Sequence, residues 1–189
     1  YDGKAPSMKV RELREAMLAE EVDEWAAARE CEDWTEVVDG AGDVLYLAAG
    51  DCVVFGWHCA LPIRAGIRAE TIDLDWAHDL YRKYGRAHLD DIVAAAVKEI
   101  DAAGFDPRKV VDEIADSNLS KLLTSDRDEI ETASIYDSIG VSIEYRGEIP
   151  LRAAVSAQDQ EGADGKHYPR GKILKSIYWR APDFSACRL

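Results

Sequence analysis

The chain has 189 residues, of which 47% are hydrophobic and 32% are charged, and its formal net charge at pH 7 is −14. This length and composition are typical of one globular domain with a substantial apolar core. A strongly acidic surface repels nucleic-acid backbones and anionic lipids, so nucleic acids and membranes are disfavoured as partners. A nucleotide is still an acceptable ligand, because metal ions can bridge carboxylates and phosphates.

The cysteines show no C-x-x-C spacing and no regular framework; they are Cys31, Cys52, Cys59 and Cys187. They therefore predict neither a zinc site nor a disulfide scaffold, and a reducing cytoplasm is the expected compartment. The apolar run 44–59 is interrupted by Asp51 and His58 and is too short to span a membrane comfortably. It indicates a buried helix.

Two long helices joined by a short break are predicted in the N-terminal part of the chain. The first follows Ser7 as N-cap, and its apolar face is set by Leu18, Val22 and Trp25. The second runs over 34–58 after Asp33 as cap and is apolar on nearly all sides, which predicts a central position. The tryptophans on or beside this apolar stripe are expected in the core; they are Trp25, Trp34 and Trp57.

Three further helices are predicted over 72–85, 87–104 and 105–122. Gly104 closes the second of these, and Asp106 with Pro107 opens the third. It is the last helix that the sequence predicts. Residues 141–156 alternate around Arg146-Gly147 and predict a hairpin, whereas 157–171 read as an exposed loop. The predicted fold is mainly α: a helical bundle with a small β-hairpin extension after the last core helix.

Carboxylates recur at helical spacing on both long helices. The first carries an E-E-x-x-E pattern, and the second carries three acids at i, i+3 and i+7; these residues are Glu20, Glu21, Glu24, Glu36, Asp39 and Asp43. An antiparallel pair of helices would bring the two acidic stripes face to face. Such like charges destabilise each other unless cations bind, and oxygen ligands favour Mg²⁺, which leaves positions open for phosphates.

Simpler interpretations exist for some of these acids. A run such as E-E-V-D-E on a helix is most often a solvated face, and Asp33-x-x-Glu36 resembles a capping box. Glu36 is therefore either a ligand or a cap. Asp39 and Asp43 are harder to explain in this way, because their neighbours are almost all apolar and an uncompensated buried carboxylate is costly.

E-E-x-x-E followed by E-x-x-D resembles the signature of the all-α nucleoside triphosphate pyrophosphohydrolases. That group includes MazG-like proteins, dimeric dUTPases and phosphoribosyl-ATP pyrophosphohydrolase. Three segments resemble the corresponding segments of one branch of this group, which is found in phages and some bacteria. They are "VVDGAGDVLYLAAG", "VVDEIADSNLSKL" and "YPRGKILKSIYWRAPDF". The resemblance covers 8–58, 107–123 and 168–184. It leaves 60–105 and 124–165 as insertions in a single MazG-like domain over 1–189.

The resemblance implies roles for particular residues. Glu21, Glu24, Glu36 and Asp39 would be the principal Mg²⁺ ligands. Glu20 would bind a further ion or help to activate the attacking water, so that Glu20 and Glu21 are the catalytic candidates. Asp43 would be either a ligand or an acceptor behind the ligands. The substrate-binding candidates, for sugar or phosphates, are Asn118, Lys121, Lys172 and Lys175. Tyr178 and Trp179 are candidates for a nucleotide lid.

The implied activity is Mg²⁺-dependent hydrolysis of a (deoxy)nucleoside triphosphate at the α-phosphate, with Mn²⁺ as a substitute ion. The products would be a nucleoside monophosphate and pyrophosphate, and the role would be nucleotide pool cleansing or phage dNTP remodelling. The resemblance also implies a homodimer or homotetramer in the cytoplasm, the host's if the protein is phage-encoded. The alternatives are phosphoribosyl-ATP hydrolysis and a non-catalytic helical scaffold or nucleotide sensor. dUTP, dGTP and dATP all remain open as substrates.

Overall fold

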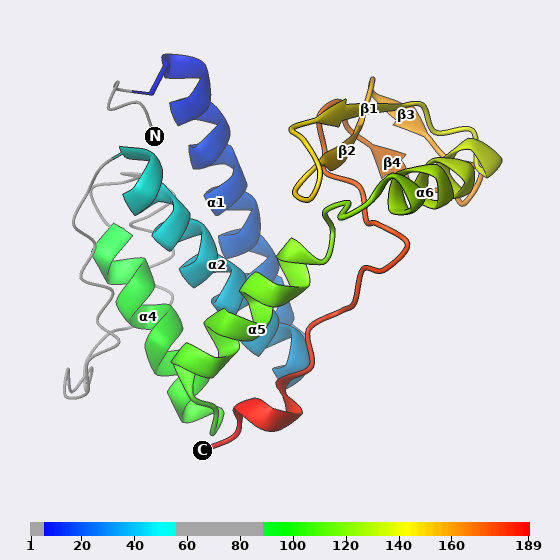
Figure 1. Ribbon diagram of the computed structural model, residues 1–189. Helices are drawn as coiled ribbons and strands as arrows, with labels where there is room; N and C mark the ends of the chain where they lie inside the picture. Colours follow the sequence, from blue (N-terminus) through cyan, green and yellow to red (C-terminus); the bar gives the residue numbers. More distant parts are fainter. Residues whose placement is uncertain (1–5, 56–88) are drawn as a thin grey trace. The chain divides into compact units, whose positions relative to one another are not determined.

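The computed structural model describes residues 6–55 and 89–189. They form two compact units, one running to Ile114 and including Asp183–Leu189, the other spanning Ala115–Pro182 (Figure 1). The fold is mainly helical, as the sequence predicts, with small antiparallel sheets after the helices of the first unit. None of the helices within the described ranges is long and apolar enough to cross a membrane.

The first unit is a bundle of helices around α2. Its elements are α1 (Met8–Glu30), α2 (Trp34–Phe55), α4 (Leu89–Ala102), the start of α5 (Pro107–Leu119) and the short 3-10 helix η2 (Phe184–Cys187). α2 packs against α1 on one side and α4 on another, which confirms its predicted central position (Figure 1). The predicted helix over 72–85 and the last three residues of the predicted 34–58 helix lie outside the described residues.

The predicted helix starts are confirmed by their capping hydrogen bonds. Ser7 Oγ accepts from the N–H of Val10 at 3.3 Å, and Asp106 Oδ1 accepts from the N–H of Arg108 at 2.9 Å. Gly104, after the end of α4, has φ of +83°, a left-handed conformation that glycine adopts without strain. Local sequence chemistry therefore fixed these helix ends.

The core of the first unit follows the predicted apolar faces. Leu18, Val22 and Trp25 are buried on α1, and the buried apolar side chains of α2 lie between Val37 and Ala48. α4, although it lies inside the expected insertion 60–105, contributes several fully buried residues to the same core. Trp34 differs from the prediction: it is 61% exposed, because it is the first residue of α2 and precedes the helix's first buried turn.

The second unit contains a helix that the sequence did not predict, α6 (Asp126–Ser138). Ser125 caps it, accepting a hydrogen bond from the N–H of Asp128. The buried side chains of α6 are Asp128, Thr132 and Tyr136, all of which carry polar groups. The helix therefore has no apolar stripe at helical spacing, and periodicity could not reveal it.

The hairpin predicted over 141–156 is confirmed. β1 (Ile143–Arg146) pairs antiparallel with β2 (Ala153–Ser156), and Ile143 lies opposite Ser156. Gly147, directly after β1, has φ of +79°. The predicted exposed loop 157–171 contains a second small pair, β3 (Gln160–Glu161) with β4 (His167–Tyr168). A small core packs between these elements; it comprises Leu123, Tyr136, Val141, Ala154 and Leu174.

Candidate functional site

Close contact between α1 and α2 sets the frame for the carboxylates. A Cβ added at Gly40 would lie 3.0 Å from both Cα and Cβ of Trp25, so the two helices approach to backbone distance there. On its other side α2 packs against α5, since a Cβ at Gly42 would lie 2.9 Å from side-chain atoms of Val110 and Ile114. Glycine is needed at both positions because no larger residue fits without a shift.

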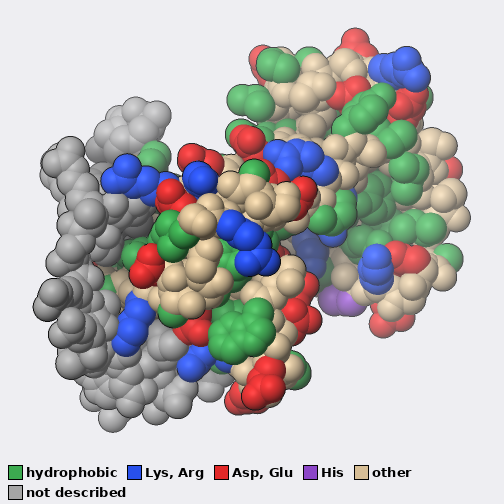
Figure 2. Space-filling model, turned by 90° about the horizontal axis from the view of Figure 1, so that it is seen from below, with side chains coloured by type: hydrophobic (Ala, Val, Ile, Leu, Met, Phe, Trp, Pro, Cys, Tyr) green, Lys and Arg blue, Asp and Glu red, His purple; other side chains and the backbone are tan. Residues whose placement is uncertain are grey.

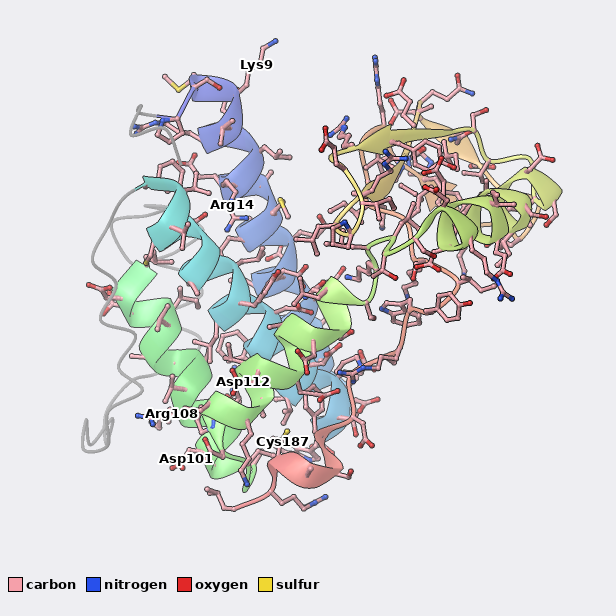
Figure 3. All side chains as sticks on the ribbon, in the orientation of Figure 1. Lys9, Arg14, Asp101, Arg108, Asp112 and Cys187 are labelled. Carbon is pink, nitrogen blue, oxygen red and sulfur yellow. The ribbon has the colours of Figure 1, made fainter. Side chains whose placement is uncertain are left out.

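A buried ion pair gives a second fixed point between the same helices. Arg14 Nε lies 2.5 Å from Asp51 Oδ1, and its Nη2 donates to the carbonyl oxygen of Leu47 at 2.6 Å. Asp51 is 1% exposed. Figure 3 shows Arg14 extending from α1 beside α2. The sequence marked Asp51 only as an interruption of an apolar run; the basic residue that compensates it lies 37 positions earlier.

These two contacts define the register of the helix pair. Arg14 and Trp25 are eleven residues apart on α1, and their counterparts Asp51 and Gly40 are eleven residues apart on α2. The helices are therefore antiparallel and keep the same register over these eleven residues. The same register places Glu21 opposite Val44, the neighbour of Asp43. It likewise places Glu24 opposite Ala41, two residues from Asp39.

The carboxylates also share one side of the helix pair. At about 100° per residue, Glu21 and Glu24 lie to one side of Trp25, and Asp39 and Asp43 lie to the corresponding side of Gly40. In an antiparallel pair these two sides form one surface. Glu21, Asp39 and Asp43 are half-buried, whereas Glu20, Glu24 and Glu36 are exposed. We call this surface, with its six carboxylates, the acidic flank.

The turn between α1 and α2 resolves one ambiguity about Glu36. Asp33 Oδ1 accepts from the N–H groups of Thr35 and Glu36, at 3.2 and 3.3 Å, and so caps α2 as predicted. The reciprocal half of a capping box is absent, because the N–H of Asp33 donates to the carbonyl oxygen of Ala28 instead. The Glu36 carboxylate is therefore not engaged in the cap.

The ligand atoms that the acidic flank offers suit a hard divalent cation, since all of them are carboxylate oxygens. Within residues 6–55 and 89–189, however, no three acidic, histidine or cysteine side chains are already arranged to hold a metal ion. Figure 2 looks onto the end of the bundle that bears the α1–α2 turn, where acidic and basic side chains are both exposed.

The substrate-binding candidates belong to the second unit, and two of them are in direct contact. Lys121 Nζ donates to Asn118 Oδ1 at 2.6 Å. The predicted Lys175 lies with its Nζ 3.3 Å from the ring centroid of Trp179, a cation–π contact. The Trp179 ring face that meets the Lys175 ammonium is thus covered, while Tyr178 beside it is 56% exposed.

Hydrogen bonds join the two sequence segments that carry these candidates. Ser176 Oγ donates to the carbonyl oxygen of Ser120 at 2.7 Å, and Ser120 Oγ accepts from the N–H of Arg180 at 3.1 Å. Ser117 Oγ donates to the carbonyl oxygen of Arg180 at 2.9 Å. The end of α5, with Asn118 and Lys121, therefore lies against the segment that bears Lys175. The two motifs, more than fifty residues apart in sequence, meet in space.

Lys172 stands apart from this junction. Its carbonyl oxygen accepts from the N–H of Ser156, next to the bridge between Val155 and Ile173, and its side chain is exposed.

The segment 166–180 holds five Lys and Arg residues and no Asp or Glu. The second unit carries nine basic and eleven acidic residues, a net charge of −2, so most of the chain's −14 lies in the first unit. Repulsion of phosphates is therefore weak in the second unit.

Comparisons with known proteins found one matching family model and one relative. Residues 1–61 match the model of a family described as phosphoribosyl-ATP pyrophosphohydrolase. Protein L479 of Acanthamoeba polyphaga mimivirus, named as uncharacterized, is 26% identical over 213 residues, which cover 92% of this chain and 81% of the viral protein. No solved structure matches the chain.

The matched residues include the whole of α1 and α2, and with them all six carboxylates of the acidic flank. Over residues 1–61, the chain is similar to the phosphoribosyl-ATP pyrophosphohydrolase family.

Proposed function

We propose that this protein hydrolyses a (deoxy)nucleoside triphosphate between the α- and β-phosphates, in the presence of Mg²⁺, to a nucleoside monophosphate and pyrophosphate. The observation that carries the proposal is the register of α1 and α2, which sets Glu21 beside Asp43 and Glu24 near Asp39 on one surface. This surface lies within the segment that matches the family.

The acidic flank would hold the metal through Glu21, Glu24, Glu36 and Asp39, with Mn²⁺ as a substitute ion. Bound Mg²⁺ supplies neutralisation of phosphate charge and a lowered pKa for coordinated water. Asp43 is half-buried beside Glu21, which suits either a direct ligand or an acceptor behind the ligands. Placing several carboxylates together without a cation is unfavourable, so metal binding should stabilise the fold.

Glu20 and Glu21 are the proposed catalytic carboxylates. Water attacks the α-phosphorus, the bond from that phosphorus to the oxygen bridging the β-phosphate breaks, and pyrophosphate leaves. The exposed Glu20 takes the proton lost by the attacking water, and the half-buried Glu21 would be a ligand of the Mg²⁺ ion. Positioning and charge stabilisation supply most of the rate in phosphoryl transfer.

The substrate-binding candidates of the second unit offer groups that suit a nucleotide. The Asn118–Lys121 pair offers an amide and an ammonium within 2.6 Å of each other, suited to a sugar hydroxyl or a phosphate. Lys175 and Lys172 are further phosphate partners. Because Lys175 already covers one face of Trp179, a base would stack on Tyr178 or on the other face of Trp179.

A pyrophosphate-release assay over all common NTPs and dNTPs, with Mg²⁺ or Mn²⁺, tests the proposal. We expect turnover of at least one nucleotide by the full-length protein, with a nucleoside monophosphate as the co-product. Release of orthophosphate instead would place the cleavage at the γ-phosphate and contradict the mechanism. If no nucleotide is hydrolysed with either ion, the enzyme function is wrong and a nucleotide-binding or scaffold role takes its place.

Phosphoribosyl-ATP is a second candidate substrate, favoured by the description of the matching family. It contains the same α,β-phosphoanhydride, so the acidic flank would serve both reactions unchanged. Including phosphoribosyl-ATP in the same panel separates the two, by comparing kcat/KM for each compound. We expect a dNTP to be the better substrate.

A homodimer or homotetramer is also proposed. Within the described residues, α1 offers apolar side chains to which a second copy could bind. Val10, Leu13 and Met17 are 38%, 59% and 37% exposed and share one stripe with Glu21 and Glu24. Light scattering after size exclusion should give a multiple of 21.0 kDa. Leu13→Lys should then shift the mass toward the monomer.

A further inference from the structure

The helix α6 contributes two buried polar side chains that hold the backbone of the Lys175 segment. The Tyr136 hydroxyl donates to the carbonyl oxygen of Lys175 at 3.2 Å and accepts from the N–H of the same residue at 3.0 Å. Thr132 Oγ1 accepts from the N–H of Ile177 at 3.1 Å. Tyr136 is 8% exposed and Thr132 is fully buried. All three bonds are therefore shielded from competing water.

The hydroxyl of Tyr136 is separable from the packing of its ring. The ring meets that of Tyr168 edge-on, with centroids 6.0 Å apart and an angle of 88° between the planes. That contact and the burial of the ring in the small core would persist without the oxygen. Burial raises the pKa of Tyr136 above its ordinary value, so the phenol stays protonated and can donate.

Lys175 is thus held at three points. Tyr136 bonds both of its backbone polar groups, and Trp179 receives its ammonium on the ring face at 3.3 Å. The next residue, Ser176, bonds to Ser120, the neighbour of Lys121. The backbone bond to Tyr136 therefore determines where a Lys175 ammonium can reach with respect to the Asn118–Lys121 pair.

We infer that Tyr136 is a positioning residue for anion binding by Lys175, acting through the Lys175 backbone rather than by touching the substrate. The inference rests on the proposed function, in which Lys175 contacts the substrate's phosphates. It assigns a task to α6, the helix that the sequence did not reveal. In this assignment α6 is the support for the Lys-bearing C-terminal segment.

The experiment compares Tyr136→Phe with Tyr168→Phe in the full-length protein. Tyr136→Phe removes the two bonds to Lys175, and we expect KM for the hydrolysed nucleotide to rise about 5- to 10-fold while kcat changes less than about twofold. Tyr168→Phe removes a hydroxyl that donates to the exposed Asp164 at 2.8 Å, in the same small core. It should leave KM unchanged. Equal effects of the two variants would overturn the inference.

A double-mutant cycle with Lys175→Met separates positioning from general stability. If Tyr136 acts through Lys175, then Tyr136→Phe should raise KM no further once Lys175→Met is present. A merely structural role would give the same factor in both backgrounds, and that result would refute the proposal. Should Tyr136→Phe fail to fold, Thr132→Val replaces it in the same cycle, because it removes the bond to Ile177 at nearly constant shape.

Failure of the proposed function can be told apart from failure of this inference. Calorimetric titration with inorganic tripolyphosphate, at fixed Mg²⁺, measures anion binding without requiring turnover. Weaker binding by Tyr136→Phe, lost in the Lys175→Met background, supports the inference even if no nucleotide is hydrolysed. Nucleotide hydrolysis with tripolyphosphate affinity unchanged by Tyr136→Phe would uphold the function and reject the positioning role.

Discussion

Gly40→Ala tests whether the approach of α1 to α2 sets both stability and the acidic flank. The new Cβ would lie 3.0 Å from two carbon atoms of Trp25, one of them in the backbone. Carbon atoms pack at about 3.5–4.0 Å, so the helices would have to separate by about 0.5–1 Å. Trp25 is fully buried, so it cannot move out into solvent without losing its packing.

Two terms determine the size of the effect. Overpacking of a well-packed core costs about 1–3 kcal/mol. Replacing a mid-helix glycine by alanine returns about 0.5–1 kcal/mol through the unfolded chain. The free energy of unfolding should therefore fall by about 1–2 kcal/mol, which lowers Tm by about 2–8 °C for a chain of this length. Affinity for Mg²⁺ should fall as well, because Asp39 and Glu24 move apart with the helices.

Urea unfolding followed by far-UV circular dichroism measures the free energy of unfolding. The dependence of Tm on Mg²⁺ concentration measures the affinity for Mg²⁺. Gly42→Ala is the matched control. Its Cβ would meet side-chain atoms of Val110 and Ile114 on α5 rather than atoms of α1. It should also cost stability, because both residues are buried and β-branched, but it should leave Mg²⁺ affinity unchanged. A Gly40→Ala protein as stable as the parent, with the same Mg²⁺ affinity, would refute the register on which the acidic flank depends.

Three further predictions concern single side chains. Glu24→Ala should abolish pyrophosphate release and the Mg²⁺-induced rise in Tm, yet leave metal-free stability within about 0.5 kcal/mol, because Glu24 is exposed; marked unfolding in metal-free buffer would point to a structural role. Arg14→Leu should cost about 3–5 kcal/mol in urea unfolding, since the buried Asp51 loses its ion pair; a loss below about 1 kcal/mol would contradict this. Hydrogen bonds from Ser125 and Thr124 lower the pKa of Asp128 from 3.8 to about 2, so its stabilising contribution is complete above pH 3.8 and disappears as the pH falls toward 2. Asp128→Asn should remove that part of the acid dependence in a pH-dependent Tm series, and an unchanged profile would show that other groups cause it.

Local chemistry in the sequence was sufficient for much of the first unit. Caps at Ser7, Asp33 and Asp106 each satisfy backbone N–H groups within three residues, so they are visible without a fold. The face of α1 followed from the spacing of its apolar residues. The hairpin over 141–156 could also be predicted from spacing, because apolar and polar residues alternate there and Arg146-Gly147 interrupts the alternation.

Tertiary structure alone decided the features that depend on partners distant in sequence. The compensation of Asp51 by Arg14 and the fit of Gly40 against Trp25 require two helices to be placed, and no local pattern encodes either. α6 escaped detection because it buries hydroxyl-bearing and acidic side chains rather than an apolar stripe. The sequence thus determined the acids and the helices that bear them. Packing between helices decided the register of α1 against α2, because side-chain contact across a bundle depends on register and not on spacing within one helix.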